Sequence, residues 1–225
     1  MCIIKENIKK LKSDNNFSDS FCKIRTFLES KENDDYVLSF CEQCGRVAND
    51  SCSSENHRLS KLTKSGFKSP VSVLRPKSQD KKEAQYFFSE SSSDQIMHII
   101  KSQCFTNVLC VGCPSLFENL PPSVFNQSLL IDIDARLKNF YGEKQFLWGN
   151  FFNGHFFHGE TSAEVFQNFL IKCDKLLIIF DPPFGAKTEL ISHSLNRVRN
   201  QLGEVKILEP ITQYNPSLTA FLQPS

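Results

Sequence analysis

The stretch "LLIIFDPPFG", residues 176–185, joins a short apolar run to an aspartate, two prolines, an aromatic residue and a glycine. The apolar run predicts a buried strand. This strand must end near Asp181, because Pro182 and Pro183 have no N–H group to donate to a sheet. In open α/β sheets, ligands bind at the carboxyl ends of the strands. Asp181 is therefore a candidate functional acid, although the same residue types also form ordinary rigid turns.

These residues suit one kind of chemistry, methyl transfer to the exocyclic amine of adenine. That nitrogen is a poor nucleophile because its lone pair is delocalised into the ring, so a catalyst has to orient it. The Asp181 carboxylate and the Pro182 carbonyl can accept the two amine hydrogens, and Phe184 can stack on the base. Proline at position 183 fixes the direction of the chain. The predicted catalytic residues are Asp181, Pro182, Pro183 and Phe184.

A second group of chemically active residues lies in "CEQCGRVANDSCSSENH", residues 41–57. Cys41 and Cys44 form a C-x2-C pair, whose turn can present two sulfur atoms to one cation, and Cys52 and His57 complete a set of four ligands. We predict a structural zinc site, because four protein ligands leave no open coordination position. The spacing from Cys52 to His57 departs from the commonest zinc-finger spacings, so a cysteine-rich loop without metal is the alternative.

The elements that would position the first group alternate along the chain from residue 85 onward. Buried strands are predicted within 107–114, 128–137, 146–152, 176–180 and 205–210, and helices within 91–103, 162–173 and 188–202. Ser93 or Asp94 would cap the first of these helices. A strand ending at Gly112, about twenty residues and a second strand ending at Asp132 and Asp134 follow the order of a nucleotide-binding α/β half. In that arrangement an acid binds ribose hydroxyl groups.

Composition limits the class of protein. A chain of 225 residues can form one sizeable core and a small extra module. The net charge of +1 gives no overall attraction to nucleic acid or to acidic membranes. Nine cysteines, with neither a leader-like apolar segment nor a membrane span in the sequence, favour reduced thiols and metal ligation. We therefore expect a soluble intracellular protein, in the nucleus, the nucleolus or the cytoplasm.

The composition also changes along the chain and suggests four parts. Residues 1–40 are polar and mixed, with a short helix expected over 22–30, and residues 41–57 are the zinc module. Residues 58–84 form a basic linker, whose stretch 58–82 carries eight Lys or Arg against one Asp. Such a stretch is either a solvated connector or a source of phosphate contacts to RNA. Residues 85–225 form the α/β domain.

Five motifs, in this order and spacing, resemble a known family: "AQYFF", "VLCVGCP", "LLIDIDAR", "NFFNGHFFHG" and "FDPPFG". They look like the zinc-finger CCHC-type methyltransferases that modify N6 of an adenosine in large-subunit ribosomal RNA. The resemblance runs from about Phe21 to Leu202. It implies a Rossmann-like methyltransferase fold with a small zinc module, S-adenosylmethionine as the cofactor and RNA as the partner.

The resemblance also implies roles for individual residues toward the cofactor. The segment formed by Gln85, Tyr86, Phe87 and Phe88 would close over the cofactor, although core packing is the favoured reading for the last two. Gly112 would approach its methionine part, and Asp132 would take its ribose. Asn150 and Phe151 would flank its adenine, with a loop cap as the plainer role for Asn150.

The sequence departs from the family pattern in three ways. It offers only Gly112 at the first turn, where many methyltransferases have several glycines. A zinc module ahead of this part and the cysteine-rich fingers after the catalytic domain are missing. The fold usually has seven strands, and five are predicted here, so we expect a truncated chain with an incomplete sheet. Two alternatives follow: a catalytically inactive zinc-containing RNA-binding or adaptor protein, and a protein-lysine methyltransferase.

Overall fold

The computed structural model describes residues 17–31, 38–48, 52, 57–74, 88–182, 186–202 and 207–212 of the chain. The chain divides into two compact units. The N-terminal unit comprises Met1–Arg75 together with Asp134–Glu143, and the sheet unit comprises Pro76–Ile133 together with Lys144–Ser225. The chain therefore leaves the sheet unit after Ile133, contributes Asp134–Glu143 to the N-terminal unit, and returns to the sheet unit at Lys144. Among the described residues, no helix is both long and apolar enough to cross a membrane.

The N-terminal unit is built on a small antiparallel sheet with the strand order β2-β1-β3. Its strands are β1 (Leu38–Cys41), β2 (Arg46–Ala48) and β3 (Leu59–Leu62). Its helices are α2 (Phe17–Glu29), α3 (Lys64–Lys68), α4 (Pro70–Val73) and the 3-10 helix η1 (Ala135–Asn139). Ile24 and Leu28 of α2 are buried, and the rings of Phe40 and Phe140 meet edge to face at 5.3 Å.

The stretch where a basic linker was expected begins with regular structure. Leu59 and Leu62 pair with the two ends of β1, and Leu62 is fully buried. The Thr63 hydroxyl then caps α3 by accepting a hydrogen bond of 3.0 Å from the amide of Gly66. The linker was predicted from charge alone. Because Lys61 and the other basic residues separate the apolar positions, the apolar pattern was too short to indicate a strand or a helix here.

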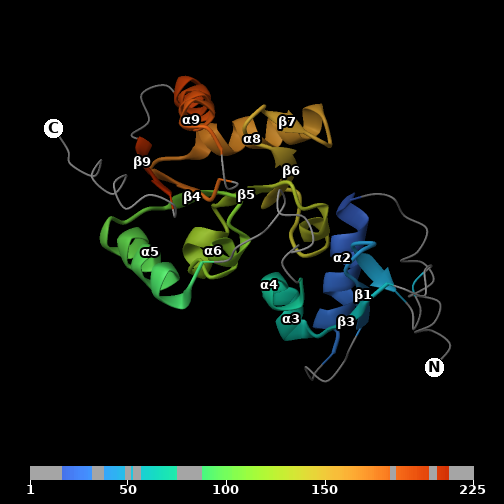
Figure 1. The fold of residues 1–225 in the computed structure, drawn as a ribbon. Helices are drawn as coiled ribbons and strands as arrows, with labels where there is room; N and C mark the ends of the chain where they lie inside the picture. Colours follow the sequence, from blue (N-terminus) through green and yellow to red (C-terminus); the bar gives the residue numbers. More distant parts are fainter. Residues whose placement is uncertain are drawn as a thin grey trace. The chain divides into compact units, whose positions relative to one another are not determined.

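The sheet unit contains a six-stranded sheet with the order β7-β6-β5-β4-β8-β9. Its strands are β4 (Asn107–Val111), β5 (Leu129–Asp132), β6 (Phe146–Asn150), β7 (His155–Phe156), β8 (Leu176–Phe180) and β9 (Ile207–Thr212). Its helices are α5 (Glu90–Ser102), α6 (Pro114–Glu118), α7 (Pro122–Phe125), α8 (Glu160–Lys172) and α9 (Thr188–Leu202). Helices α8 and α9 cover one face of the sheet, and α5 and α6 cover the other (Figure 1).

The strand order confirms the predicted α/β class. Strands β6, β5, β4, β8 and β9 are parallel, and in chain order they form the sequence 3-2-1-4-5 of a nucleotide-binding half. The strand order reverses between β4 and β8. In open α/β sheets, ligands bind beyond the carboxyl ends of the strands at such a point. Gly112 and Asp181 directly follow these two strands.

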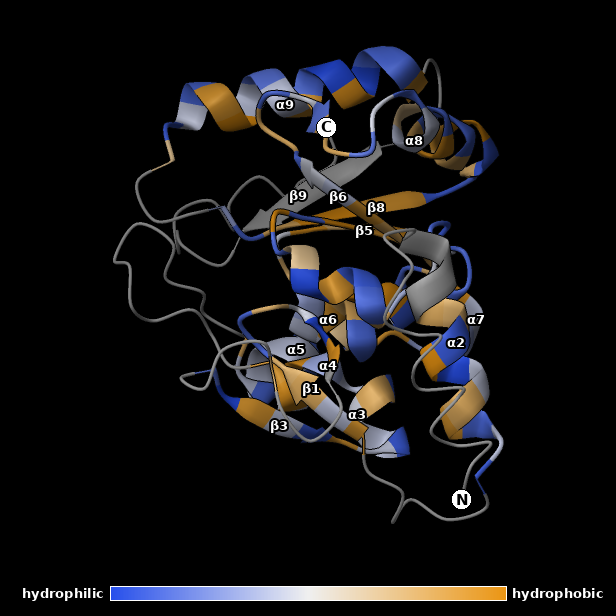
Figure 2. Ribbon diagram, turned by 90° about the vertical axis from the view of Figure 1, so that its right-hand side faces the viewer, coloured by the Kyte–Doolittle hydropathy of each residue, from blue (hydrophilic) through white to orange (hydrophobic). Residues whose placement is uncertain are grey.

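The core lies on both faces of the central strands. Every residue of β4, β5 and β8 is buried, as the near-continuous apolar runs in the sequence predicted for strands covered on two sides. Figure 2 shows β5 and β8 coloured as hydrophobic, beneath α8 and α9. Val198 and Leu202 of α9 join the cluster that covers one of these faces.

Two local expectations differ from the structure. Helix α5 begins after Ser89, whose hydroxyl accepts a hydrogen bond from the amide of Ser92, so neither Ser93 nor Asp94 is its cap. Strand β7 was not predicted, because its two residues are too few to show an alternating pattern. The helix predicted over 188–202 is confirmed with the same bounds.

Candidate functional site

Two predicted residues, Gly112 and Asp181, meet at the carboxyl edge of the sheet. Gly112 donates a backbone hydrogen bond of 2.9 Å to Ile131 on one side, and Asp181 donates one of 2.9 Å to Val111 on the other. The turn at Gly112 has a φ of +71°, which favours glycine. A β-carbon at position 112 would lie 2.7 Å from the carbonyl oxygen of Asp181. Position 112 must therefore be glycine for β8 to bring Asp181 this close to β4.

Two carboxyl groups of this edge influence each other. Asp132 ends β5 and is buried, and Asp181 follows β8. Burial, together with the negative charge of Asp132, raises the pKa of Asp181 from an ordinary value of 3.8 to about 7. The thiol of Cys113, which directly follows Gly112, lies 3.6 Å from the carbonyl oxygen of Ile179, and burial holds its pKa well above the usual range. The edge is thus acidic and poorly hydrated, which favours a cationic ligand.

The structure distinguishes Asp132 from Asp134, the other acid after this strand. Asp134 belongs to the N-terminal unit, where its carboxylate accepts hydrogen bonds of 2.6–3.0 Å from the Arg136 guanidinium. It also accepts one from the amide of Arg136 and so caps η1. Asp134 has a structural role, which leaves Asp132 as the acid of the sheet edge.

Ile133 is a candidate site residue that the sequence reading missed. It directly follows Asp132, and 61% of its surface is exposed. An exposed isoleucine beside a buried acid offers an apolar surface to a ligand that the acid holds. The sequence does contain a signal for it: Ile133 is an apolar residue that comes directly after Asp132, the acid that ends the strand.

Asn150 and Phe151 lie at the end of β6. The Asn150 side chain accepts a hydrogen bond of 3.0 Å from the amide of Phe152, which is the loop-cap role named above as its alternative. The ring of Phe151 is buried and meets the ring of Phe180 at 5.3 Å. Contacts of both residues toward a cofactor therefore stay predictions.

The remaining predicted residues of the cofactor and base sites fall partly outside the described residues. Phe88 is buried directly before the cap of α5, and Pro182 is half-buried after Asp181. Outside the described residues lie Gln85, Tyr86, Phe87, Pro183 and Phe184.

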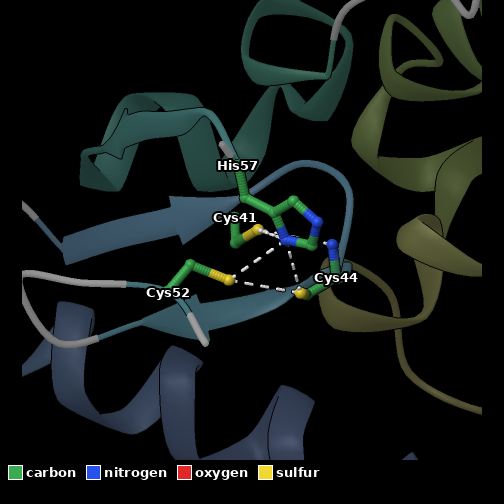
Figure 3. Close-up of side chains that lie close together, drawn as sticks. All are labelled: Cys41, Cys44, Cys52 and His57. Atoms are coloured by element: carbon green, nitrogen blue, oxygen red, sulfur yellow. Dashed lines mark hydrogen bonds between the residues drawn. The ribbon is translucent and has the colours of Figure 1, made fainter. Parts of the chain in front are cut away.

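The four predicted metal ligands lie together. Their ligand atoms are all within 4.8 Å of one another, and Figure 3 shows the side chains of Cys41, Cys44, Cys52 and His57 pointing toward one point. Nδ1 of His57 is 3.2 Å from the sulfur of Cys44, 3.3 Å from that of Cys52 and 3.7 Å from that of Cys41. A tetrahedral zinc ion with ordinary bond lengths needs ligand atoms about 3.5–3.8 Å apart. The group could therefore hold a metal ion.

The turn between the first two ligands has the geometry that a metal needs. The amide of Cys44 donates to the sulfur of Cys41 at 3.3 Å, and the amide of Gly45 donates to the Cys41 carbonyl at 2.8 Å. Gly45 has a φ of +60°, and its carbonyl accepts a hydrogen bond from the side chain of Asn139 in η1. Segment 134–143 thus supports the metal group within the N-terminal unit.

The sheet edge fits S-adenosylmethionine in three respects. The buried acid Asp132 can accept hydrogen bonds from ribose hydroxyls, and the exposed Ile133 offers an apolar surface to a purine. The two acids favour a positive charge, as a sulfonium group carries. The close turn at Gly112 keeps this edge free of a side chain between the acids.

Comparisons with known proteins agree with this geometry. The family described as "Probable N6-adenine methyltransferase" matches residues 79–219. The rRNA N(6)-adenosine-methyltransferase ZCCHC4 of Xenopus tropicalis is 37% identical over 174 residues, which are 71% of this chain and 35% of that protein. The protein of the same name from Homo sapiens is 33% identical over 153 residues, 64% of this chain and 30% of its own length. The chain spans about a third of the length of these relatives. Because the family match extends over more than half of its sequence, the chain belongs to the probable N6-adenine methyltransferase family.

Proposed function

We propose that this chain contains the catalytic part of an S-adenosylmethionine-dependent methyltransferase that acts on N6 of adenosine in RNA. The observation that carries the proposal is the position of Asp181. It follows β8, beside the Gly112 turn and near the acid Asp132, at the point where the strand order reverses. The names of the relatives support RNA, and ribosomal RNA in particular, as the substrate.

S-adenosylmethionine, when bound, supplies a methyl group on a positively charged sulfur. Asp132 would hold its ribose, and Ile133 would contact its purine. The Asp181 carboxylate and the Pro182 carbonyl would accept the hydrogens of the adenine amine and turn its lone pair toward the methyl group. Removing water from this edge strengthens both interactions.

The zinc assignment belongs to the same proposal. Three thiolates and one neutral imidazole suit zinc, and four protein ligands make the site structural. Burial raises the pKa of the Cys41 thiol to about 11, so a divalent cation is what would make it a thiolate at neutral pH. The metal would then hold β1 and the turn after it in place.

The test measures methyl transfer to an adenosine-containing ribosomal RNA fragment. Asp181→Ala should lower the rate by about 10²–10³ while RNA affinity stays nearly unchanged. Asp174→Ala is the matched control, because Asp174 is exposed and precedes the same strand that Asp181 follows. Asp132→Ala should instead weaken S-adenosylmethionine binding by about 1–3 kcal/mol in calorimetry.

The outcomes separate the alternatives. The full-length human relative serves as the positive control for the RNA assay. If the chain binds the cofactor and methylates a lysine peptide but no RNA, it is a protein-lysine methyltransferase. If it binds RNA without binding the cofactor, it is an adaptor. Equal rates for the parent chain and Asp181→Ala would contradict the role given to Asp181.

A further inference from the structure

Four aromatic side chains form a row on the hairpin of β6 and β7, which we call the aromatic row: His155, Phe157, Trp148 and His158. The ring centroids of His155 and Phe157 are 5.1 Å apart, those of Phe157 and Trp148 are 4.5 Å apart, and those of Trp148 and His158 are 5.5 Å apart. Phe157 is 42% exposed, and both histidines are exposed.

The alternation of side chains along the hairpin explains why Trp148, His155 and Phe157 face away from the core. Phe156 packs against Phe166 on the core side, with ring centroids 5.6 Å apart. Gly149 makes room for it, because a β-carbon there would lie 2.7 Å from the Phe156 ring. Side chains alternate along a strand, so the neighbours of Phe156 point to the opposite face. Phe156 thus packs against the core, whereas His155 and Phe157 on either side of it are exposed.

The aromatic row adjoins the proposed active edge. Trp148 is opposite Asp132 in the register of β5 and β6. Its indole N–H donates a hydrogen bond of 3.0 Å to the carbonyl of Ile133, the residue directly after that acid. This bond fixes the position of the indole ring beside the carboxyl ends of the strands. The Trp148 ring of the row therefore lies beside the residues proposed to hold the cofactor.

We infer that the aromatic row is a stacking surface for unpaired RNA bases next to the target adenosine. This rests on the proposed function, because methylation of an amine requires the adenine to leave its stack. Its neighbours then lose a stacking partner, which an exposed aromatic side chain can replace. Stacking needs no base-specific hydrogen bond, so the row would accept any base sequence.

The chemistry of the row favours RNA over a protein partner. Its two histidines offer N–H groups that can donate to phosphate or ribose oxygens between the stacked bases. It is also short and confined to one hairpin, so its exposed apolar area is small compared with a stable protein interface. Aromatic side chains on which successive bases stack are typical of single-strand binding surfaces.

The experiment uses fluorescence, because Trp148 is the only tryptophan in the sequence. A single-stranded RNA of about ten nucleotides should quench its emission, and the same RNA annealed to its complement should not. Phe157→Ala should weaken single-strand binding by about tenfold, and Phe157→Tyr should keep it. Leu190→Ala is the matched control, because Leu190 is similarly exposed, at 49%, on α9.

Calorimetry with S-adenosylmethionine completes the design. Phe157→Ala should leave cofactor affinity unchanged, and a loss there would make the row part of the cofactor site instead. The inference would be overturned if the chain bound the single strand and the duplex equally well. It would also be overturned if Phe157→Ala bound the single strand as tightly as the parent chain does. Asp181→Ala should retain the quenching by RNA. A chain that shows this quenching without methyl transfer would contradict the proposed function, but not the binding of single-stranded RNA by the aromatic row.

Discussion

Asp181 has two properties that act against each other. In the proposed function it accepts hydrogen bonds from an amine, which requires the carboxylate form. Burial and the charge of Asp132 raise its pKa to about 7 and so favour the neutral form. A positively charged ligand at this edge would lower the pKa of Asp181 again and so favour its carboxylate form.

This conflict predicts a dependence of stability on pH. The folded-state pKa of Asp181 lies above its ordinary value of 3.8, so between these values the folded chain binds the proton more tightly than the unfolded chain. Its contribution to stability is fully present below about pH 4 and is lost as the pH rises through about 7. Asp181→Asn should remove this loss and so be more stable than the parent chain at pH 8, but not at pH 4.

The measurement is urea unfolding of the parent chain and Asp181→Asn across this range. Asp132→Asn removes the like charge but leaves the burial, so in that background the loss of stability should be smaller and should be complete at a lower pH. The parent's kcat/KM for methyl transfer should rise with pH through about 7, as Asp181 becomes a carboxylate. A parent and an Asp181→Asn variant with parallel stability curves would show that Asp181 does not titrate in this range.

At the scale of elements, helix α9 holds the loop that follows β6. Arg197 donates a hydrogen bond to the carbonyl of Phe151, and its guanidinium lies over the ring of the same residue, 5.9 Å from the centroid. The hydroxyl of Ser194 contacts the carbonyl of Phe152 at 3.2 Å. The helix that starts after the Asp181 loop thus also sets the position of the β6 loop.

We expect Arg197→Ala to loosen this loop. It removes a charged donor and a ring contact, which should lower the free energy of unfolding by about 1–2 kcal/mol. Amide hydrogen exchange in residues 151–154 should rise, while exchange in β4 stays slow. Arg199→Ala is the matched control, because Arg199 is exposed on the same helix. If both variants exchange alike in this loop, Arg197 does not hold it.

The elements differ in how well the sequence predicted them. The apolar runs in the sequence predicted the positions of β4, β5 and β8, because a strand that is covered on both faces is apolar along nearly its whole length. The contact of Arg197 with the β6 loop could not be predicted, since it joins residues that are 46 positions apart in the sequence. Nor does the sequence show that Asp134 pairs with Arg136 whereas Asp132 belongs to the sheet edge.

At the scale of the whole molecule, the metal group and segment 134–143 belong to one unit although they are far apart in the sequence. That Cys41, Cys44, Cys52 and His57 lie together was predictable from their types and spacing alone, because thiols and imidazole at short intervals are typical of metal sites. The role of residues 134–143 was not, because nothing in their composition distinguishes them from an ordinary loop after a strand. Asp132 and Asp134 are two positions apart and belong to different units.

Removing the metal should therefore affect a segment that is distant in the sequence. Purified protein should contain about one equivalent of zinc. Removal of the zinc by a chelator should speed amide exchange at Gly45. It should also speed exchange in η1, because the Asn139 side chain donates a hydrogen bond to the Gly45 carbonyl. Cys44→Ser should show the same exchange without chelator. Cys22→Ser is the matched control, because Cys22 is exposed on α2 of the same unit. Protein that lacks zinc, or η1 exchange that chelation does not change, would contradict a structural metal at this site.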